Sequence, residues 1–227
     1  MSIAKTILEA VPSLLCGAGK SLGLVVCCIG LGMILGIPIG IGHMFGSRWT
    51  RLLLWGFDSF FRGFPAIVLL FIFFFGIGSV PGLRLSPFVA AMLALGFRSA
   101  AYQGQIYRGT LAMIDQGQTD AARSIGMSKR QAIRHVLLPQ ALRLSIPGVA
   151  NEYAVVLKDS ALAFTVGVVE LMSRGKFLAT ATRETLWVYA VVAAIYWGLT
   201  QGGFVVTGVL SNLTAIPGFG GKDGGDR

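Results

Sequence analysis

The chain has 227 residues, of which 54% are hydrophobic and only 13% are charged, and its formal net charge is +9. Soluble domains carry roughly 25% charged residues, so this composition excludes a soluble enzyme, a disordered chain and a disulfide scaffold. It indicates an all-helical integral membrane protein, whose basic residues flank membrane spans rather than bind nucleic acid.

Five apolar stretches are long enough to span a membrane, because the ~30 Å hydrocarbon core needs about 20 helical residues. In chain order they cover residues 21–42, 53–78, 87–108, 145–169 and 186–210. Gly32, Gly36 and Gly40 are spaced by four in the first stretch, which predicts a smooth helix face that another helix can approach closely. Pro38 in the same stretch predicts a kink.

The basic residues predict the orientation of these spans. An odd number of spans places the two termini on opposite sides of the membrane. If segments 44–52 and 110–143 share a side with the C-terminal tail, that side carries nine Lys and Arg residues and the other side six. The positive-inside rule then places the N-terminus outside and the C-terminus in the cytoplasm.

The polar segment 110–143 is predicted to form two short helices. The first covers residues 119–125, with Thr119 and Asp120 near its start, where negative charge suits the free N–H groups. Gly126 follows at the position that favours a left-handed residue after a helix.

The second helix of this segment begins with a capping box and is predicted to end at Pro139. Ser128 and Gln131 have the spacing of the box. From the residues alone, the helix pair is either an amphipathic anchor on the lipid surface or a docking element for a soluble partner.

Charged and polar residues inside the apolar stretches are candidates for a substrate path, because such groups are costly in a membrane. The set consists of Arg62, Arg98, Asn151, Glu152, Lys158 and Asp159. Glu152 is expected to face a central cavity, with Asn151 nearby, and to contact a cationic part of the substrate. Asp58 lies four residues before Arg62, at the spacing of a helical ion pair. The alternative for all these groups is a structural ion pair or a side chain that reaches the membrane interface.

No metal ion or cofactor is predicted. The cysteines (Cys16, Cys27, Cys28) and the histidines (His43, His135) lack the spacing of metal ligands. The run from Cys16 to Ser21 has Leu14 where a phosphate-binding loop requires glycine.

A family resemblance rests on the segment with the two short helices. Its residues match the pattern EAA-x3-G-x9-I-x-L-P of the "EAA" loop of ABC importer permeases, with Asp for the first Glu and Val for Ile. The matching residues are Asp120, Ala121, Ala122, Gly126, Val136, Leu138 and Pro139. Runs such as Phe61-Arg62-Gly63-Phe64-Pro65 and Leu157-Lys158-Asp159-Ser160 resemble the polar amino-acid branch of these permeases. The resemblance extends from about residue 19 to residue 210.

The resemblance implies a type I ABC importer permease of about five transmembrane helices in the cell inner membrane. The transmembrane domain would cover residues 19–211, after an N-terminal segment 1–18 and before a cytoplasmic tail 212–227. Residues 110–143 would form the loop that couples the permease to its ATPase.

The implied partners are two ATP-binding cassette subunits, a second permease chain that is identical or similar, and an extracytoplasmic amino-acid-binding protein. ATP hydrolysis would reside in the separate subunits, so the chain itself would not be an enzyme.

Other functions stay open at the level of sequence. A permease of the same type could carry another small polar solute. A membrane enzyme is a weaker alternative, because no HExxH motif and no Cys–His pairing is present. A stand-alone channel or carrier would normally show internal repeats and more spans.

Overall fold

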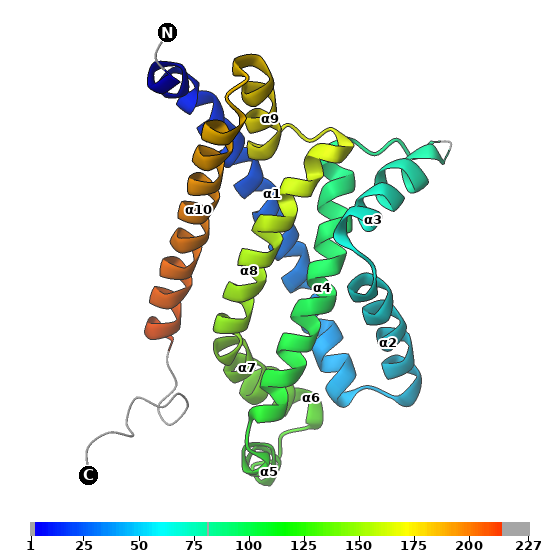
Figure 1. The fold of residues 1–227 in the computed structure, drawn as a ribbon. Helices are drawn as coiled ribbons and strands as arrows, with labels where there is room; N and C mark the ends of the chain where they lie inside the picture. Colours follow the sequence, from blue (N-terminus) through cyan, green and yellow to red (C-terminus); the bar gives the residue numbers. More distant parts are fainter. Residues whose placement is uncertain (1–2, 81, 215–227) are drawn as a thin grey trace, which may run out of the picture.

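The computed structural model describes residues 3–80 and 82–214, and within these ranges every regular element is a helix (Figure 1). The three longest helices are α1 (Ile3–Phe45), α4 (Pro87–Met113) and α10 (Thr185–Leu213). The shorter elements are α2 (Arg48–Gly63), α3 (Ala66–Phe71), η1 (Ile72–Gly76), η2 (Ile77–Ser79), α5 (Gln116–Ser124), α6 (Lys129–Ala132), η3 (Ile133–Leu137), α7 (Leu138–Leu144), α8 (Ile146–Ser160), η4 (Ala161–Val166) and α9 (Leu171–Thr182). The all-helical fold predicted from the sequence is confirmed.

Helix α1 is longer than the first predicted span. It begins within the predicted N-terminal segment and runs through Pro38 without interruption, so no break in the helix marks the boundary at residue 19. The predicted tail, residues 212–227, lies almost entirely outside the described residues. Helix α10 reaches Leu213 and marks the end of the described chain.

The glycine face predicted on α1 packs against α4. A Cβ built on Gly40 would lie 2.8 Å from the Cβ of Tyr107, and one on Gly36 would lie 3.0 Å from the Cβ of Gln103. A Cβ on Gly32 would meet the amide of Gln103 even more closely. The two helices therefore approach each other along a seam that admits no side chain on α1.

The predicted span 53–78 is not one continuous helix. The chain bends by 103° between α2 and α3–η1. Phe64 is extended at the break because it precedes Pro65, whose ring disfavours helical backbone in the residue before it. Figure 1 shows the two helices diverging from the rest of the bundle.

Two helices of the described residues are long and apolar enough to span a membrane, Ala10–Phe45 and Thr185–Leu213, and the bent pair can supply a third span. The other two predicted stretches fall on α4 and on α8–η4. Many residues of α4 are buried inside the protein, so its surface need not be apolar along its whole length. The α-helix of α8 is only 15 residues long and passes into η4, which ends at the left-handed Gly167.

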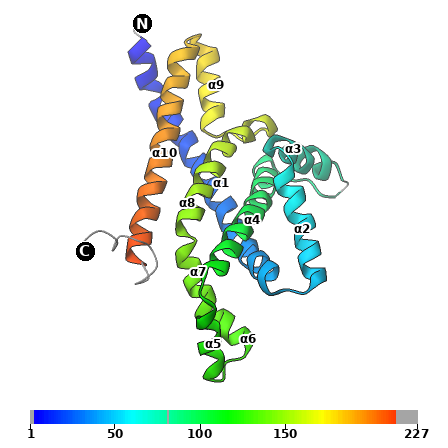
Figure 2. The same ribbon diagram turned by 60° about the horizontal axis from the view of Figure 1, so that its bottom comes forward.

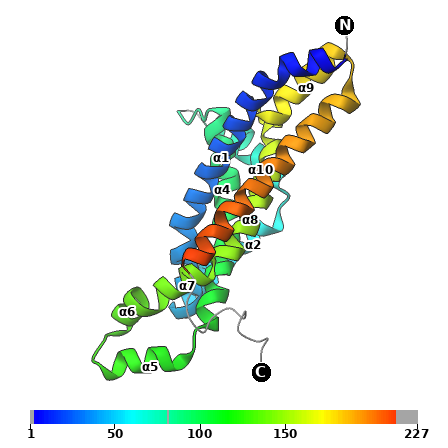
Figure 3. The ribbon, with the colours of Figure 1, turned by 90° about the vertical axis from the view of Figure 1, so that its left-hand side faces the viewer.

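The helices sort the connecting segments to two ends of the molecule. Figure 1 shows the start of α1, α9 and the start of α10 at the upper end, with α5, α6 and the end of α10 at the lower end. Figure 3 shows α1, α8 and α10 running side by side between these ends. The main hydrophobic core lies between them, where α1, α3, α4 and α8 meet.

Candidate functional site

The two short helices predicted in segment 110–143 are present, and they project beyond the ends of the long helices (Figure 2). The first begins earlier than expected. Asp115, not Thr119 or Asp120, caps α5, because its carboxylate accepts the backbone N–H of Gly117 at 2.7 Å. A helix that starts at Gln116 leaves Asp120 exposed in its middle.

Gly126 has the left-handed conformation that the sequence predicts, with φ at +86°. The N–H of Met127 donates to the carbonyl of Ala122, and the N–H of Gly126 donates to that of Arg123. These two bonds satisfy the last carbonyls of α5 in the manner of a Schellman motif. The turn is thus fixed by backbone hydrogen bonds, and no atom lies within 4 Å of a Cβ added at Gly126.

The second helix starts with the predicted capping box. The hydroxyl of Ser128 accepts the N–H of Gln131, and the side chain of Gln131 accepts the N–H of Ser128 at 2.8 Å. Both exchanges satisfy N–H groups that the first turn of a helix leaves free.

The prediction that this helix ends at Pro139 is wrong. The chain continues from α6 through the π-helical turn η3 into α7. In a regular α-helix the ring of Pro139 would clash with the carbonyl four residues earlier, and the wider π-turn gives it room. The side-chain amide of Gln140 donates to the carbonyl of Val136 at 2.9 Å, at the end of the widened turn.

The loop rests on the lower ends of α1 and α4 through a small hydrophobic cluster. Its buried members are Leu111, Ile114, Leu137 and Ala141, and Ile41, Phe45, Ile133, Val136 and Leu144 pack around them. The predicted coupling residues divide accordingly. Ala122 is buried, Val136 and Leu138 are half-buried, and Asp120, Ala121, Gly126 and Pro139 are exposed.

One exposed apolar residue at the tip of this loop carries no signal in the sequence pattern. Ile125 lies in the turn between α5 and α6, and 75% of its surface is exposed. A cavity of about 380 Å³ lies beside the tip, and its lining includes Arg123, Met127 and Lys129. The loop therefore offers an apolar residue and basic groups at the far end of a rigid, capped helix pair.

Three of the charged candidates in the membrane region, Arg62, Arg98 and Asp159, lie close to one another. Arg98 of α4 and Asp159 of α8 form an ion pair. Arg98 and Arg62 each lie 5.0 Å from the centroid of the Tyr102 ring. The aromatic ring thus brings two cations from different helices together, and only one of them has a carboxylate partner within the described chain.

The predicted pair of Asp58 and Arg62 does not form. Asp58 is buried and accepts hydrogen bonds from Gln105 and from Nε2 of His43, the latter at 2.8 Å. Asp58 of α2 is therefore joined to the end of α1 through His43 and to α4 through Gln105. Sequence analysis assigned no partner to His43, because the two residues are 15 positions apart. A cleft of about 580 Å³ opens beside this pair and includes Arg62 and Arg108.

Glu152 and Asn151 point in different directions. Glu152 is 4% exposed, and its Oε1 has no hydrogen-bond partner among the described residues. The polar and charged side chains close enough to influence its carboxyl group electrostatically are Arg98 and Ser99 of α4 and Asp159 of its own helix. Asn151 and Lys158 are exposed. Glu152 therefore lies inside the chain in this conformation, and its predicted contact with a central cavity stays a prediction.

A second buried carboxylate, Glu170, was not singled out from the sequence. It caps α9 by accepting the N–H groups of Met172 and Ser173, both at 2.8 Å. It also accepts the hydroxyls of Ser21 from α1 and Tyr196 from α10. Among the described residues no group of three or more His, Cys, Asp or Glu side chains could hold a metal ion.

Comparison with known proteins identifies the same kind of chain. Residues 29–215 match the sequence profile of the family described as "Binding-protein-dependent transport system inner membrane component". The L-cystine transport system permease protein TcyL of Bacillus subtilis (strain 168) is 34% identical over 197 residues, which cover 84% of this chain and 82% of that protein. The glutamine transport system permease protein GlnP of Escherichia coli (strain K12) is 31% identical over 192 residues, which cover 84% and 88%.

Solved structures share the fold. A crystal structure of an amino acid ABC transporter with histidines matches with a TM-score of 0.83 and 27% identity, over 94% of this chain and all of that one. An inward-facing structure of the MetNI methionine ABC transporter matches with a TM-score of 0.78 and 20% identity, over 95% of this chain and all of that one.

Proposed function

The chain belongs to the family of binding-protein-dependent transport system inner membrane components, and from this premise we propose that it carries polar amino acids through a pair of permease chains. It is the permease subunit of an ABC importer, and ATP is hydrolysed by separate subunits.

The proposal for coupling rests on the projecting loop. A capped helix pair whose second helix continues into the membrane region can transmit a displacement, whereas a slack loop cannot. We assign the docking of the ATPase subunit to the exposed tip of the loop and assign the transmission to its buried side. Two ATPase subunits then engage two permease chains, one loop each. An extracytoplasmic binding protein delivers the substrate to the opposite end, and the loop and the C-terminus face the cytoplasm.

The substrate path is proposed to run beside the charged groups of α4 and α8. An amino acid needs a cation for its carboxylate and an acceptor for its ammonium group. Arg62, whose charge is not matched by a carboxylate in the described chain, suits the first role. Glu152 has an unused acceptor atom and suits the second, once a change in the packing of α4 and α8 exposes it. Alternating access requires such a second packing.

The test uses the permease chain assembled with its co-expressed ATPase and binding protein in vesicles. We expect ATP hydrolysis to rise when binding protein loaded with a polar amino acid is added. Glu152→Gln should preserve shape but weaken transport of a cationic amino acid by about 1–3 kcal/mol, the usual worth of a hydrogen bond to a charged group. Glu184→Gln, at the start of α10, is the matched control and should transport normally.

Two results would count against this function. Stimulation of hydrolysis by another small polar solute, but by none of the amino acids tested, would reassign the substrate. Unchanged substrate dependence in Glu152→Gln would remove the residue from the path and leave it a structural group.

A further inference from the structure

A groove lies at the elbow where α1 ends and α2 begins, next to the cleft that includes Arg62 and Arg108. Its volume is about 690 Å³, and it is lined by His43, Arg48, Trp49, Arg51, Leu52 and Trp55. Within the part of the chain that the structure describes, no acidic residue lines the groove. Phe45 and Arg48 mark the two helix ends, so the groove occupies the first turns of α2.

The charge of this groove is not neutralised by the protein. Across residues 3–80 and 82–214, neither Arg48 nor Arg51 has an ion pair, and their side chains have no hydrogen bond. His43 is the exception among the basic groups, because it turns towards the buried carboxylate of Asp58. Two guanidinium groups are thus free to bind an anion, and guanidinium forks match phosphate oxygens well.

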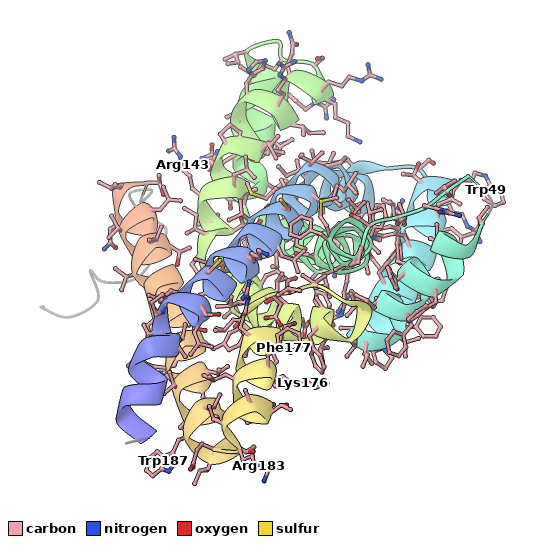
Figure 4. All side chains as sticks on the ribbon, turned by 90° about the horizontal axis from the view of Figure 1, so that it is seen from above. Trp49, Arg143, Lys176, Phe177, Arg183 and Trp187 are labelled. Atoms are coloured by element: carbon pink, nitrogen blue, oxygen red, sulfur yellow. The ribbon has the colours of Figure 1, made fainter. Side chains whose placement is uncertain are left out.

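The rest of the groove is apolar and faces outward. Trp49 and Trp55 are 75% and 65% exposed, and Leu52 between them is 55% exposed. Figure 4 shows Trp49 at the rim of the molecule, on the side away from α10. Exposed tryptophans of this kind gather at the boundary between lipid and water, where the ring sits at the headgroup level.

The position of the elbow agrees with that boundary. Phe45 is the last residue of the candidate span Ala10–Phe45, which is longer than the about 20 residues that the hydrocarbon core needs, so the groove lies at one end of this span. A ligand that fits must carry an anionic group for the two arginines and an apolar part for the tryptophans and Leu52. We infer that the elbow groove binds the headgroup of an anionic phospholipid.

Such a lipid would lie next to the coupling loop. The ammonium group of Lys129 lies 5.5 Å from the centroid of the Phe45 ring and 3.5 Å from the carbonyl of the same residue. A headgroup held at Arg48 and Arg51 would therefore lie close to the helix end on which the loop rests. The lipid would fix the elbow against which the loop moves.

The test is fluorescence quenching in mixed micelles of the full chain with brominated lipid. Trp187→Phe and Trp197→Phe leave Trp49 and Trp55 as the reporters. Brominated phosphatidylglycerol should quench these tryptophans at lower mole fraction than brominated phosphatidylcholine does. The expected preference is roughly 10- to 30-fold for two arginines at an anionic surface. Arg48→Gln with Arg51→Gln should reduce it to equality.

A matched control removes the same charge elsewhere. Arg84→Gln with Lys176→Gln alters two exposed cations at the opposite end of the molecule and should keep the preference. Equal quenching by both lipids in the parent chain would overturn the inference, and so would a preference that survives loss of Arg48 and Arg51. Displacement of the brominated lipid by inorganic phosphate at the same concentration would assign the groove to a soluble anion instead. Absence of quenching by either lipid would also overturn the inference, because lipid would then not reach the groove.

Discussion

At the scale of single residues, Glu170 shows how a carboxylate can be buried in a membrane protein without an ion pair. Its two oxygens accept two backbone N–H groups at the start of α9 and hydroxyls from α1 and α10. Hydrogen bonds to a charged acceptor are stronger than those between neutral groups, and the start of a helix favours negative charge. The residue therefore joins three helices at the upper end of the molecule.

Removing this carboxylate should destabilise the chain. Glu170→Ala leaves several buried donors without an acceptor, at a cost of about 1–3 kcal/mol for each. We expect a clearly lower midpoint of thermal unfolding in detergent. Glu184 also precedes a helix but caps nothing with its side chain, so Glu184→Ala is the control. An equal shift in both variants would show that Glu170 has no special role in stability.

Gly126 provides the corresponding test in the coupling loop. Because the space around its Cα is open and φ is +86°, only the backbone conformation opposes a larger side chain. Gly126→Val should break the turn and uncouple transport from ATP hydrolysis. Gly126→Asn should retain much of the activity, because asparagine tolerates the left-handed region better than β-branched residues do.

The measurement is substrate uptake into vesicles at equal expression, together with ATP hydrolysis by the assembled complex. Normal uptake by Gly126→Val would separate the turn from coupling. Loss of uptake in both variants would point to a requirement for glycine other than its backbone freedom.

At the scale of helices, the α1–α4 seam depends on the absence of side chains. Gly36→Val would bring a Cβ within 3.1 Å of the backbone nitrogen of Gly104, and the backbone cannot rotate away. We expect a loss of about 1–3 kcal/mol or more, as for other overpacked interiors. Gly30→Val on the same helix meets no atom within 4 Å and is the matched control. Thermal unfolding of the two variants would decide, and equal stability would contradict the seam.

The sequence predicted which parts of the chain are helical better than it predicted where helices break or join. Long apolar runs located α1, α4 and α10, and glycine spacing located the seam. The break at Phe64 had a visible signal in Pro65, but the apolar run masked it. At Pro139 the sequence predicted the end of a helix, but the helix continues, because a π-turn accommodates a proline that a regular α-helix would not.

Side-chain pairing was beyond the sequence for a geometric reason. Spacing on one helix suggested that Asp58 would meet Arg62, yet Asp58 meets His43 and Gln105 from two other helices. Arg98 and Asp159 were both flagged, but 61 positions separate them. Which face of each helix meets its neighbour depends on how the helices rotate against one another, and local spacing does not specify this. The caps around Gly126 and Ser128 were predictable because they are local.

At the scale of the whole molecule, the two ends carry different chemistry. The lower end presents the coupling loop and the α1–α2 elbow, and the upper end presents α9 and the starts of α1 and α10 (Figure 1). Of the basic segments that the positive-inside rule groups on one side, 44–52 and 110–143 both lie at the lower end. The grouping is consistent with the proposed orientation, in which the lower end is cytoplasmic.

Thiol labelling tests the orientation. In a cysteine-free background, Gln118→Cys in α5 should react with an impermeant reagent only after the cytoplasmic side is opened. Leu83→Cys, in the exposed turn before α4, should react from outside. The nearby Ser128 and Ser86 are left unchanged, because their hydroxyls cap α6 and α4 and a cysteine there would disturb the helix starts. Labelling in the reverse sense would invert the topology and with it the docking role of the loop.

The π-turn Ile133–Leu137 determines which side of α8 faces α4. One residue more than an α-turn shifts the angular phase of everything after it by about 100°, since an α-helix has 3.6 residues per turn. Helical hydrogen bonds continue across Ser145, so this phase is carried from α7 into α8. In an unbroken α-helix, Asn151 would occupy the direction in which Glu152 now points, and the carboxylate would lie about 100° further round. The extra residue in this turn of the coupling loop thus sets the direction in which Glu152 points, although Glu152 lies 15 to 19 positions further along the chain.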